Sequence, residues 1–414
     1  ADTSGQKLAP YFLQALRLIM QWADDLEERL PLVINFSYGF AAGPKDGTHI
    51  IEREIDALVR ARNQRGAPTI VVLPAGNNFE SRTTALVSLK GGQTQELTWI
   101  IPPDDETDNY LEIYVEAPGD IGAAAPAVDL KLTPPNGIPI LHAPRSDGKL
   151  QVLCDGEWPV AGIYFDRMMA VDGMNRQRFF IAVNRTLDRR GKARPAASGR
   201  WRLAVAGKGE GTTRVRLFIQ RDDTPSGYRR RGRQSYFDHP AAYQRDPAAG
   251  SYDQLCATDG EAIGPMTHSG TLSAIANGET PIVVGAAEGV DSSPPAAYTS
   301  SGPTETREGP DISAVVDQSP ALKGVMAAGT LSGSVVTMSG TSAAAPQVTR
   351  LIADRLACER DRYYSAGVFD PGKLLVDLPC EVVAFDQQHP QLGGMVVQRK
   401  RPDHIPRRKY PSTS

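Results

Sequence analysis

A serine surrounded by small residues is the strongest candidate for chemistry in this 414-residue sequence. Ser342 lies within residues 339–346 (SGTSAAAP), where a predicted helix begins that runs to about Ala357. At a helix N-terminus its hydroxyl would be exposed, and unpaired backbone N–H groups could stabilise a developing negative charge. The alternative interpretation is a serine N-cap before an alanine-rich helix, which is a common arrangement.

A second candidate group is a carboxamide at the end of a buried strand. Residues 69–73 (TIVVL) are apolar and rich in β-branched side chains, which predicts a buried parallel strand, and Asn77 follows in PAGN. Open α/β folds bind ligands beyond the carboxyl ends of their strands, so Asn77 could donate to a substrate. It could also be a turn former or a helix cap. The neighbouring run 33–39 (VINFSYG) ends in the small, flat stretch 37–39.

Alternating helix and strand patterns surround these groups. Apolar residues recur at helical spacing over residues 8–28 and 51–59, and each helical pattern is followed by a strand pattern, at 32–37 and 69–73. Strand character returns at 281–286 (PIVVGA), before the helix that begins at Ser342. Helix, strand, helix, strand with short connections is typical of a parallel α/β sheet, which is the predicted fold class.

The middle of the chain has a different period. About 140 residues after Phe79 show apolar residues at every second position, separated by Pro, Gly, Asn and Asp clusters. This pattern predicts an all-β sandwich inserted into the α/β domain, which is tolerated at an exposed loop. We expect a first α/β part at 1–80, the sandwich at 81–222, a polar linker at 223–250, a second α/β part at 251–380, and a basic, loosely ordered tail at 381–414.

Taken together, these motifs resemble the subtilisin-like serine peptidases, and they occur in that family's order. The resemblance covers roughly residues 1–80 and 255–375 and omits the predicted sandwich. It implies an endopeptidase in which Ser342 is the nucleophile and Asn77 shares the oxyanion hole with the Ser342 N–H. It also implies that Ser37, Tyr38 and Gly39 pair with an extended peptide or protein substrate. No cofactor or metal is implied.

The triad aspartate and histidine of that family precede the serine in the chain. None of the six histidines lies in a His-Gly-Thr-His context; His49, in DGTH, follows the substrate strand and is interpreted as a loop residue. We therefore expect the α/β domain to be incomplete at its N-terminus, with Asp and His supplied by an upstream segment, and the chain alone to be inactive. The alternative is a catalytically dead fold that acts as a peptide-binding or interaction module.

Composition excludes several other classes. The net charge of −3 indicates no overall field for nucleic acid, and no apolar run approaches the length of a membrane span. No signal peptide pattern is present, and localisation stays open, although the family is mostly extracellular. The four cysteines show no metal-ligand spacing, and a Cys358–Cys380 disulfide and free thiols both remain open. Acidic clusters at 104–106 and 222–223 are interpreted as solvated turns rather than calcium sites.

Overall fold

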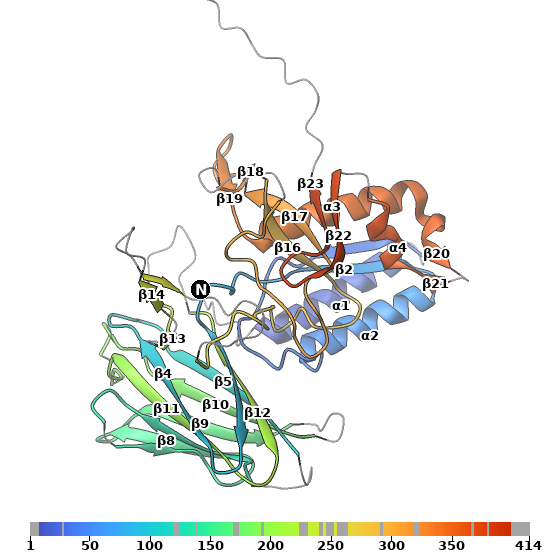
Figure 1. The fold of residues 1–414 in the computed structure, drawn as a ribbon. Coiled ribbons are helices and arrows are strands. Elements are labelled where there is room, and N and C mark those ends of the chain that lie inside the picture. Colours follow the sequence, from blue (N-terminus) through green and yellow to red (C-terminus); the bar gives the residue numbers. More distant parts are fainter. Residues whose placement is uncertain are drawn as a thin grey trace, which may run out of the picture.

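The computed structural model consists of an α/β part and a group of antiparallel sheets, side by side (Figure 1). It describes residues 8–26, 29–118, 125–137, 139–168, 174–191, 194–222, 231–239, 243–245, 252–254, 264–289, 293–317, 323–365, 368–378 and 381–398. The chain enters the antiparallel sheets shortly after Asn77 and returns to the α/β part near Met266.

The α/β part is built on a six-stranded sheet in the order β1-β2-β16-β17-β23-β22. Its strands are parallel except for the antiparallel pair β22–β23. The strands are β1 (Leu32–Asn35), β2 (Thr69–Pro74), β16 (Ile282–Glu288), β17 (Ile312–Asp317), β22 (Glu381–His389) and β23 (Gly393–Gln398). The helices are α1 (Leu8–Leu26), α2 (Ile50–Gln64), α3 (Thr341–Glu359) and α4 (Pro371–Val376).

Both faces of this sheet are covered, as the continuous apolar character of its strands predicts. On β2, Ile70 and Val72 pack in one core with α3, whereas Val71 and Leu73 pack in another core with α1 and α2. Successive side chains of a strand point to opposite faces, so a strand that is apolar throughout needs a helix layer on each side. This packing fixes the carboxyl end of β2, and therefore Asn77, relative to the start of α3.

The antiparallel strands form one six-stranded and one five-stranded sheet that share a single hydrophobic core. Trp99 of β4 (Thr94–Ile101) and Trp201 of β11 (Gly199–Gly207) are register partners on adjacent strands and are almost fully buried in this core. The first sheet contains β3 (Thr84–Lys90), β12 (Thr212–Ile219), β5 (Asn109–Ala117), β10 (Asn175–Val183), β9 (Trp158–Arg167) and β8 (Lys149–Asp155). The second contains β13 (Tyr236–Asp238), β4 (Thr94–Ile101), β11 (Gly199–Gly207), β6 (Val128–Thr133) and β7 (Leu141–His142).

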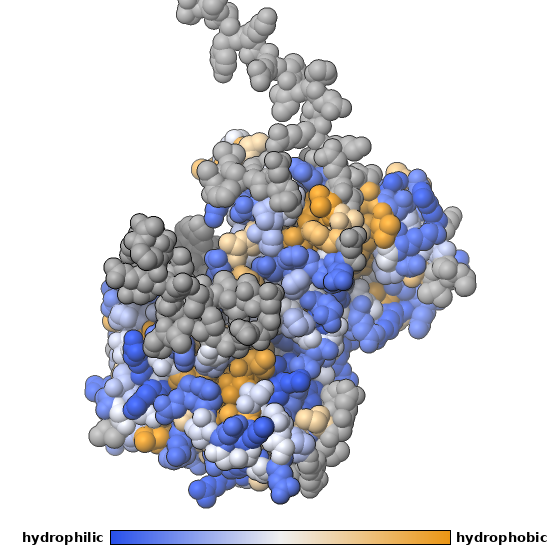
Figure 2. Space-filling view, viewed as in Figure 1, coloured by the Kyte–Doolittle hydropathy of each residue, from blue (hydrophilic) through white to orange (hydrophobic). Residues whose placement is uncertain are grey.

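Short elements complete the described chain. Three two-stranded pairs lie outside the larger sheets, and a 3₁₀ helix covers Arg360–Tyr363. The pairs are β14 (Tyr243–Arg245) with β15 (Tyr252–Gln254), β18 (Val325–Ala328) with β19 (Val335–Met338), and β20 (Tyr364–Ser365) with β21 (Val368–Phe369). The visible face is mostly hydrophilic, with hydrophobic patches on both parts (Figure 2). No helix of the described ranges is long and apolar enough to cross a membrane.

The predicted combination of a parallel-sheet α/β fold with separate antiparallel sheets is confirmed. Three segments differ from the sequence prediction, and one of them is residues 243–245 of the predicted linker, which form β14 and pair with β15. Residues 381–398, expected in a loosely ordered tail, form β22 and β23, because the apolar run 395–397 adds a parallel strand beside β17. Residues 236–238, expected in a linker, form β13, because Phe237 is buried in the core of the antiparallel sheets. Residues 399–414 lie outside the described part.

Candidate active site

Ser342 lies beside the predicted substrate segment. It is the second residue of α3, so its backbone N–H is one of those at a helix start that have no acceptor within the helix. Its Oγ donates a hydrogen bond to the carbonyl oxygen of Ser37 at 3.3 Å, and Ser37 Oγ donates to the carbonyl oxygen of Ser342 at 2.9 Å. These reciprocal bonds bring together two residues that are 305 positions apart in the chain.

The Asn77 carboxamide has a defined orientation next to Ser342. Its Oδ1 accepts hydrogen bonds from the backbone N–H and the Oγ1 of Thr341, at 3.0 and 2.9 Å. Thr341 Oγ1 also accepts from the N–H of Gly76 at 3.2 Å, which ties the end of β2 to the start of α3. Because Oδ1 is engaged, Nδ2 is the group of Asn77 that remains to donate to a ligand. Sequence reasoning did not identify Thr341 as the residue that orients Asn77.

A buried aspartate organises the loop before Ser342. Asp317, at the end of β17, accepts from Ser339 Oγ at 2.7 Å, from the N–H of Gly324 at 2.7 Å and from Tyr298 Oη at 3.0 Å. Tyr298 Oη in turn accepts from the N–H of Gly340 at 2.9 Å. Burial raises the pKa of Tyr298, so its hydroxyl stays protonated and can serve as both donor and acceptor. The sequence did not predict that these two residues contact each other or the loop before Ser342.

The substrate segment is held against the sheet and a neighbouring loop. The N–H of Phe36 donates to the carbonyl oxygen of Val72 at 3.1 Å, which extends the β1–β2 pairing beyond Asn35. A Cβ on Gly39 would lie 2.8 Å from Ser273 Oγ, so this position has no room for a side chain. The segment Ser37–Gly39 therefore follows the carboxyl end of β1, on the side where Ser342 lies.

His49 has a structural role. It is the N-cap of α2, where its Nδ1 accepts from the N–H of Ile51 at 3.2 Å, and Glu52 completes the capping box. Burial lowers the pKa of His49 to about 4, so the ring is neutral at neutral pH. None of the hydrogen bonds that Ser342 Oγ makes within the described residues involves a histidine.

The cap predicts an acid-sensitive step in stability. Because the pKa of His49 is about 4 when folded and near 6.5 when unfolded, the unfolded chain binds the proton first. The contribution of His49 to the free energy of unfolding is complete above pH 6.5. It is lost as the pH falls towards 4, and the loss is at most about 3 kcal/mol. His49→Asn keeps a capping acceptor without the titration. Urea unfolding at pH 7 and pH 4.5 should show a smaller acid loss in the variant.

Glu52 makes an opposite contribution that both proteins share. Burial raises its pKa to about 7, so its contribution to stability falls as the pH rises from 4.5 through 7. The difference between wild type and His49→Asn therefore isolates the histidine. Equal pH dependences of the two proteins would contradict the proposed titration of His49.

Gly340 offers a direct test of the Asn77 geometry. Its φ is +113°, and a Cβ there would lie 3.0 Å from Asn77 Nδ2. We expect Gly340→Ala to cost about 1–3 kcal/mol of stability, because the backbone is strained, and to displace the donor. Gly333→Ala is the matched control, since its φ is +75° but no atom lies within 4 Å of the added carbon. Thermal unfolding should detect a cost in both variants, whereas only Gly340→Ala should slow labelling of Ser342 by a fluorophosphonate in the protein that contains the predicted upstream segment.

Comparisons with known proteins agree with this architecture. The family model of the subtilase family matches residues 198–364, a range that begins just before β11 and includes Ser342. The solved structure of the CspB protease of Clostridium perfringens matches with a TM-score of 0.63 and 18% sequence identity, over 94% of this chain and 68% of that chain. At this identity, the likeness establishes the fold. A search of the curated proteins gives no match.

Residues 198–364, less than half of the chain, are therefore similar to the subtilase family, and the resemblance indicated by the sequence motifs is confirmed over that range. Asn77 and the segment 37–39 lie outside the range of the family match, and their roles remain predictions. Within the described ranges, no group of three or more His, Cys, Asp or Glu side chains could hold a metal ion. Cys154 and Cys358 are free thiols.

Proposed function

We propose that this chain is the nucleophile-bearing part of a subtilisin-type serine endopeptidase. The observation that carries the proposal is the arrangement of Asn77 and Ser342. Asn77 Oδ1 already accepts two hydrogen bonds from Thr341. The Nδ2 group therefore remains to donate a hydrogen bond to a ligand, next to a serine at the start of a helix. Acyl transfer needs two such donors for its oxyanion next to a hydroxyl nucleophile, and we infer that Asn77 Nδ2 and the Ser342 N–H supply them.

In the proposed reaction, an extended peptide lies along Ser37–Gly39, and Ser342 Oγ attacks its scissile carbonyl carbon. A histidine takes the hydroxyl proton, while Asn77 Nδ2 and the Ser342 N–H stabilise the negative oxygen. The tetrahedral species collapses to an acyl-enzyme, and the leaving amine receives the proton from the histidine. Water then attacks the ester, and the carboxylic acid leaves Ser342 free again.

We place the aspartate and histidine in an upstream segment that adds to the α/β domain. Among the described residues, β1 pairs with β2 on one edge and with no strand on the other. A strand with an unpaired row of N–H and C=O groups can accept another strand. The CspB protease chain is longer than its matched portion, because this chain covers 68% of it.

We also interpret the two antiparallel sheets as an inserted β-sandwich domain.

Covalent labelling tests the proposal. A biotinylated fluorophosphonate should label Ser342 rapidly when the authentic upstream segment is present, fused or as a separate polypeptide, and only slowly in the isolated chain. Ser342→Ala should abolish labelling, and Ser88→Ala, which removes an exposed hydroxyl on β3, should leave it unchanged. If labelling stays slow with an upstream segment that lacks an Asp/His pair, while the protein binds peptides, the interaction-module function is favoured instead.

A further inference from the structure

The chain that follows the substrate segment lies against the antiparallel sheets. Ala42 is 2% exposed and packs with Tyr114 of β5 and Phe218 of β12. The N–H of Ala42 donates to Oε1 of Gln220, the residue after β12, at 3.4 Å. The residues after Gly39 are therefore packed against the other part of the molecule within a few positions. We call residues 40–46 the bridging segment.

Charged side chains of the antiparallel sheets hold the far end of the bridging segment. Arg216 of β12 is 8% exposed, and its Nη1 donates to the carbonyl oxygen of Pro44 at 3.3 Å. The same guanidinium contacts Glu116 of β5 at 2.7 Å and Glu305 of the α/β part at 3.3 Å. One arginine thus connects the bridging segment, the sheets and a loop of the α/β part.

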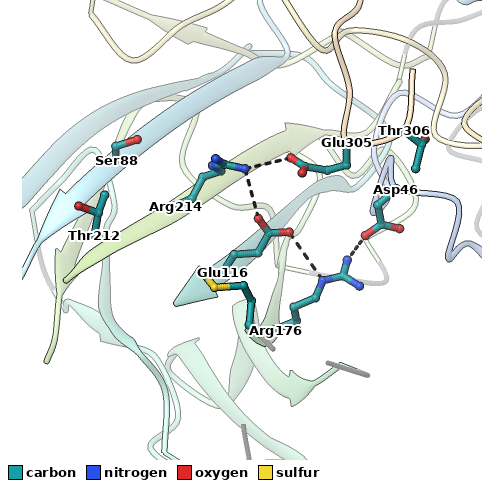
Figure 3. A pocket seen from close by; sticks show the side chains of 9 residues that line it. Asp46, Ser88, Glu116, Arg176, Thr212, Arg214, Glu305 and Thr306 are labelled. Carbon is teal, nitrogen blue, oxygen red and sulfur yellow. Dashed lines mark hydrogen bonds and ion pairs between the residues drawn. The ribbon is translucent and has the colours of Figure 1, made fainter. Parts of the chain in front are cut away.

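Two neighbouring residues add independent contacts. Asp46 forms an ion pair with Arg176 of β10, and Arg176 also contacts Glu116 at 3.7 Å (Figure 3). Lys45 is 1% exposed, donates to the carbonyl oxygen of Gly270 at 3.0 Å and lies 4.3 Å from the centroid of the Phe218 ring. Removing one partner from such buried charges leaves the others without compensation, so these contacts resist displacement.

The near end of the bridging segment continues into the peptide-binding backbone. The N–H of Phe40 donates to Ser273 Oγ at 3.1 Å, and its carbonyl oxygen accepts from the N–H of Ala274 at 2.8 Å. The Tyr38 and Phe40 rings make an edge contact with centroids 5.5 Å apart. A shift of the bridging segment would therefore move Phe40, and with it the backbone of Ser37–Gly39.

We propose that Arg216 is a positioning residue: through Pro44 and the bridging segment, the antiparallel sheets set the backbone of the peptide-binding residues Ser37–Gly39. The sheets then act on substrate affinity rather than only on stability. Arg216 touches no substrate itself. The mechanical coupling is independent of catalysis, whereas its consequence for substrate affinity rests on the proposed peptidase function.

Hydrogen–deuterium exchange of the whole chain tests the coupling directly. In Arg216→Met, amide exchange over residues 37–43 should rise about tenfold, which corresponds to about 1.4 kcal/mol of local opening free energy. Exchange in β16, whose hydrogen-bonded neighbours in the sheet are β2 and β17, should stay unchanged. Arg216→Lys keeps the charge but loses the planar fork, so it should give a smaller rise and guards against misfolding of the methionine variant.

Arg185→Met is the matched control. Arg185 pairs with Asp108 at 3.2 Å and follows the end of β10 opposite to Arg176. It should alter stability without changing exchange at 37–43. If both Arg216 variants are folded and their exchange at residues 37–43 is unchanged, the proposal is overturned.

In the enzyme with its upstream segment, Arg216→Lys should raise the KM for casein several-fold with little change in kcat. If KM does not change while amide exchange over residues 37–43 still rises, only the proposed effect on substrate affinity is rejected.

Discussion

Ser342→Ala is expected to lower kcat for casein cleavage by about 10⁶-fold in the enzyme that contains its upstream segment. That reference value was itself obtained with a subtilisin. The physical reason is that the hydroxyl forms the covalent bond, and the residual rate then comes only from binding and the oxyanion donors. In this structure Ser342 Oγ donates to the carbonyl oxygen of Ser37, an acceptor that cannot remove its proton. The chain without the upstream segment should therefore also be inert.

The measurement is release of fluorescent fragments from labelled casein by four proteins. These are the chain alone, the chain with its upstream segment, and the Ser342→Ala and Ser88→Ala variants of the latter. We expect turnover only in the second and fourth. Peptidase turnover by the chain alone that disappears with Ser342→Ala would show that a base lies within these residues. The first residue to test would then be His49, although its ring caps α2.

Asn77→Asp is expected to lower kcat by about 10²–10³-fold, or about 2.7–4 kcal/mol, with little change in fold. The reference value again comes from the oxyanion asparagine of a subtilisin. An aspartate can still accept both hydrogen bonds from Thr341, so the start of α3 should stay in place. What it loses is the Nδ2 donor, and its negative charge would also oppose the oxyanion.

Two comparisons make this test specific. Asn77→Leu removes both the donor and the Thr341 acceptor, so it should lose a similar factor in kcat and also some stability. Thr341→Val keeps Asn77 and the backbone bond but removes one of the two orienting contacts, so we expect a smaller loss, of about tenfold. If Asn77→Asp retains full kcat, Asn77 does not stabilise the oxyanion, and the catalytic assignment of this group is wrong.

Local sequence patterns were sufficient to predict the helices and strands and the positions of Asn77 and Ser342 at their ends. The apolar run 69–73 needs helices on both faces, and Asn77 follows its carboxyl end, whatever the rest of the chain does. Ser342 at the start of a helix is likewise a local property. The antiparallel sheets were evident because a period of two is a pattern of neighbouring residues.

Contacts between distant residues could not be predicted in the same way. Thr341 orients Asn77 across 264 positions, and Asp317 reaches Ser339 and Tyr298 from separate elements. Each is an ordinary polar residue in its own neighbourhood, so nothing local indicates its partner. Residues 395–397 were assigned to a tail because they are followed by Arg and Lys. Their strand is stabilised by pairing with β17.

The sequence by itself therefore determined which elements form and where Asn77 and Ser342 lie within them, and their acyl-transfer role stays a prediction. The tertiary structure decided how the Asn77 amide is turned, what surrounds Ser342, and that Arg216 holds the bridging segment. The physical reason is range. Side-chain period and strand ends depend on neighbours within a few residues, whereas hydrogen-bond orientation and buried charge pairing depend on partners that only the folded chain brings within about 3 Å.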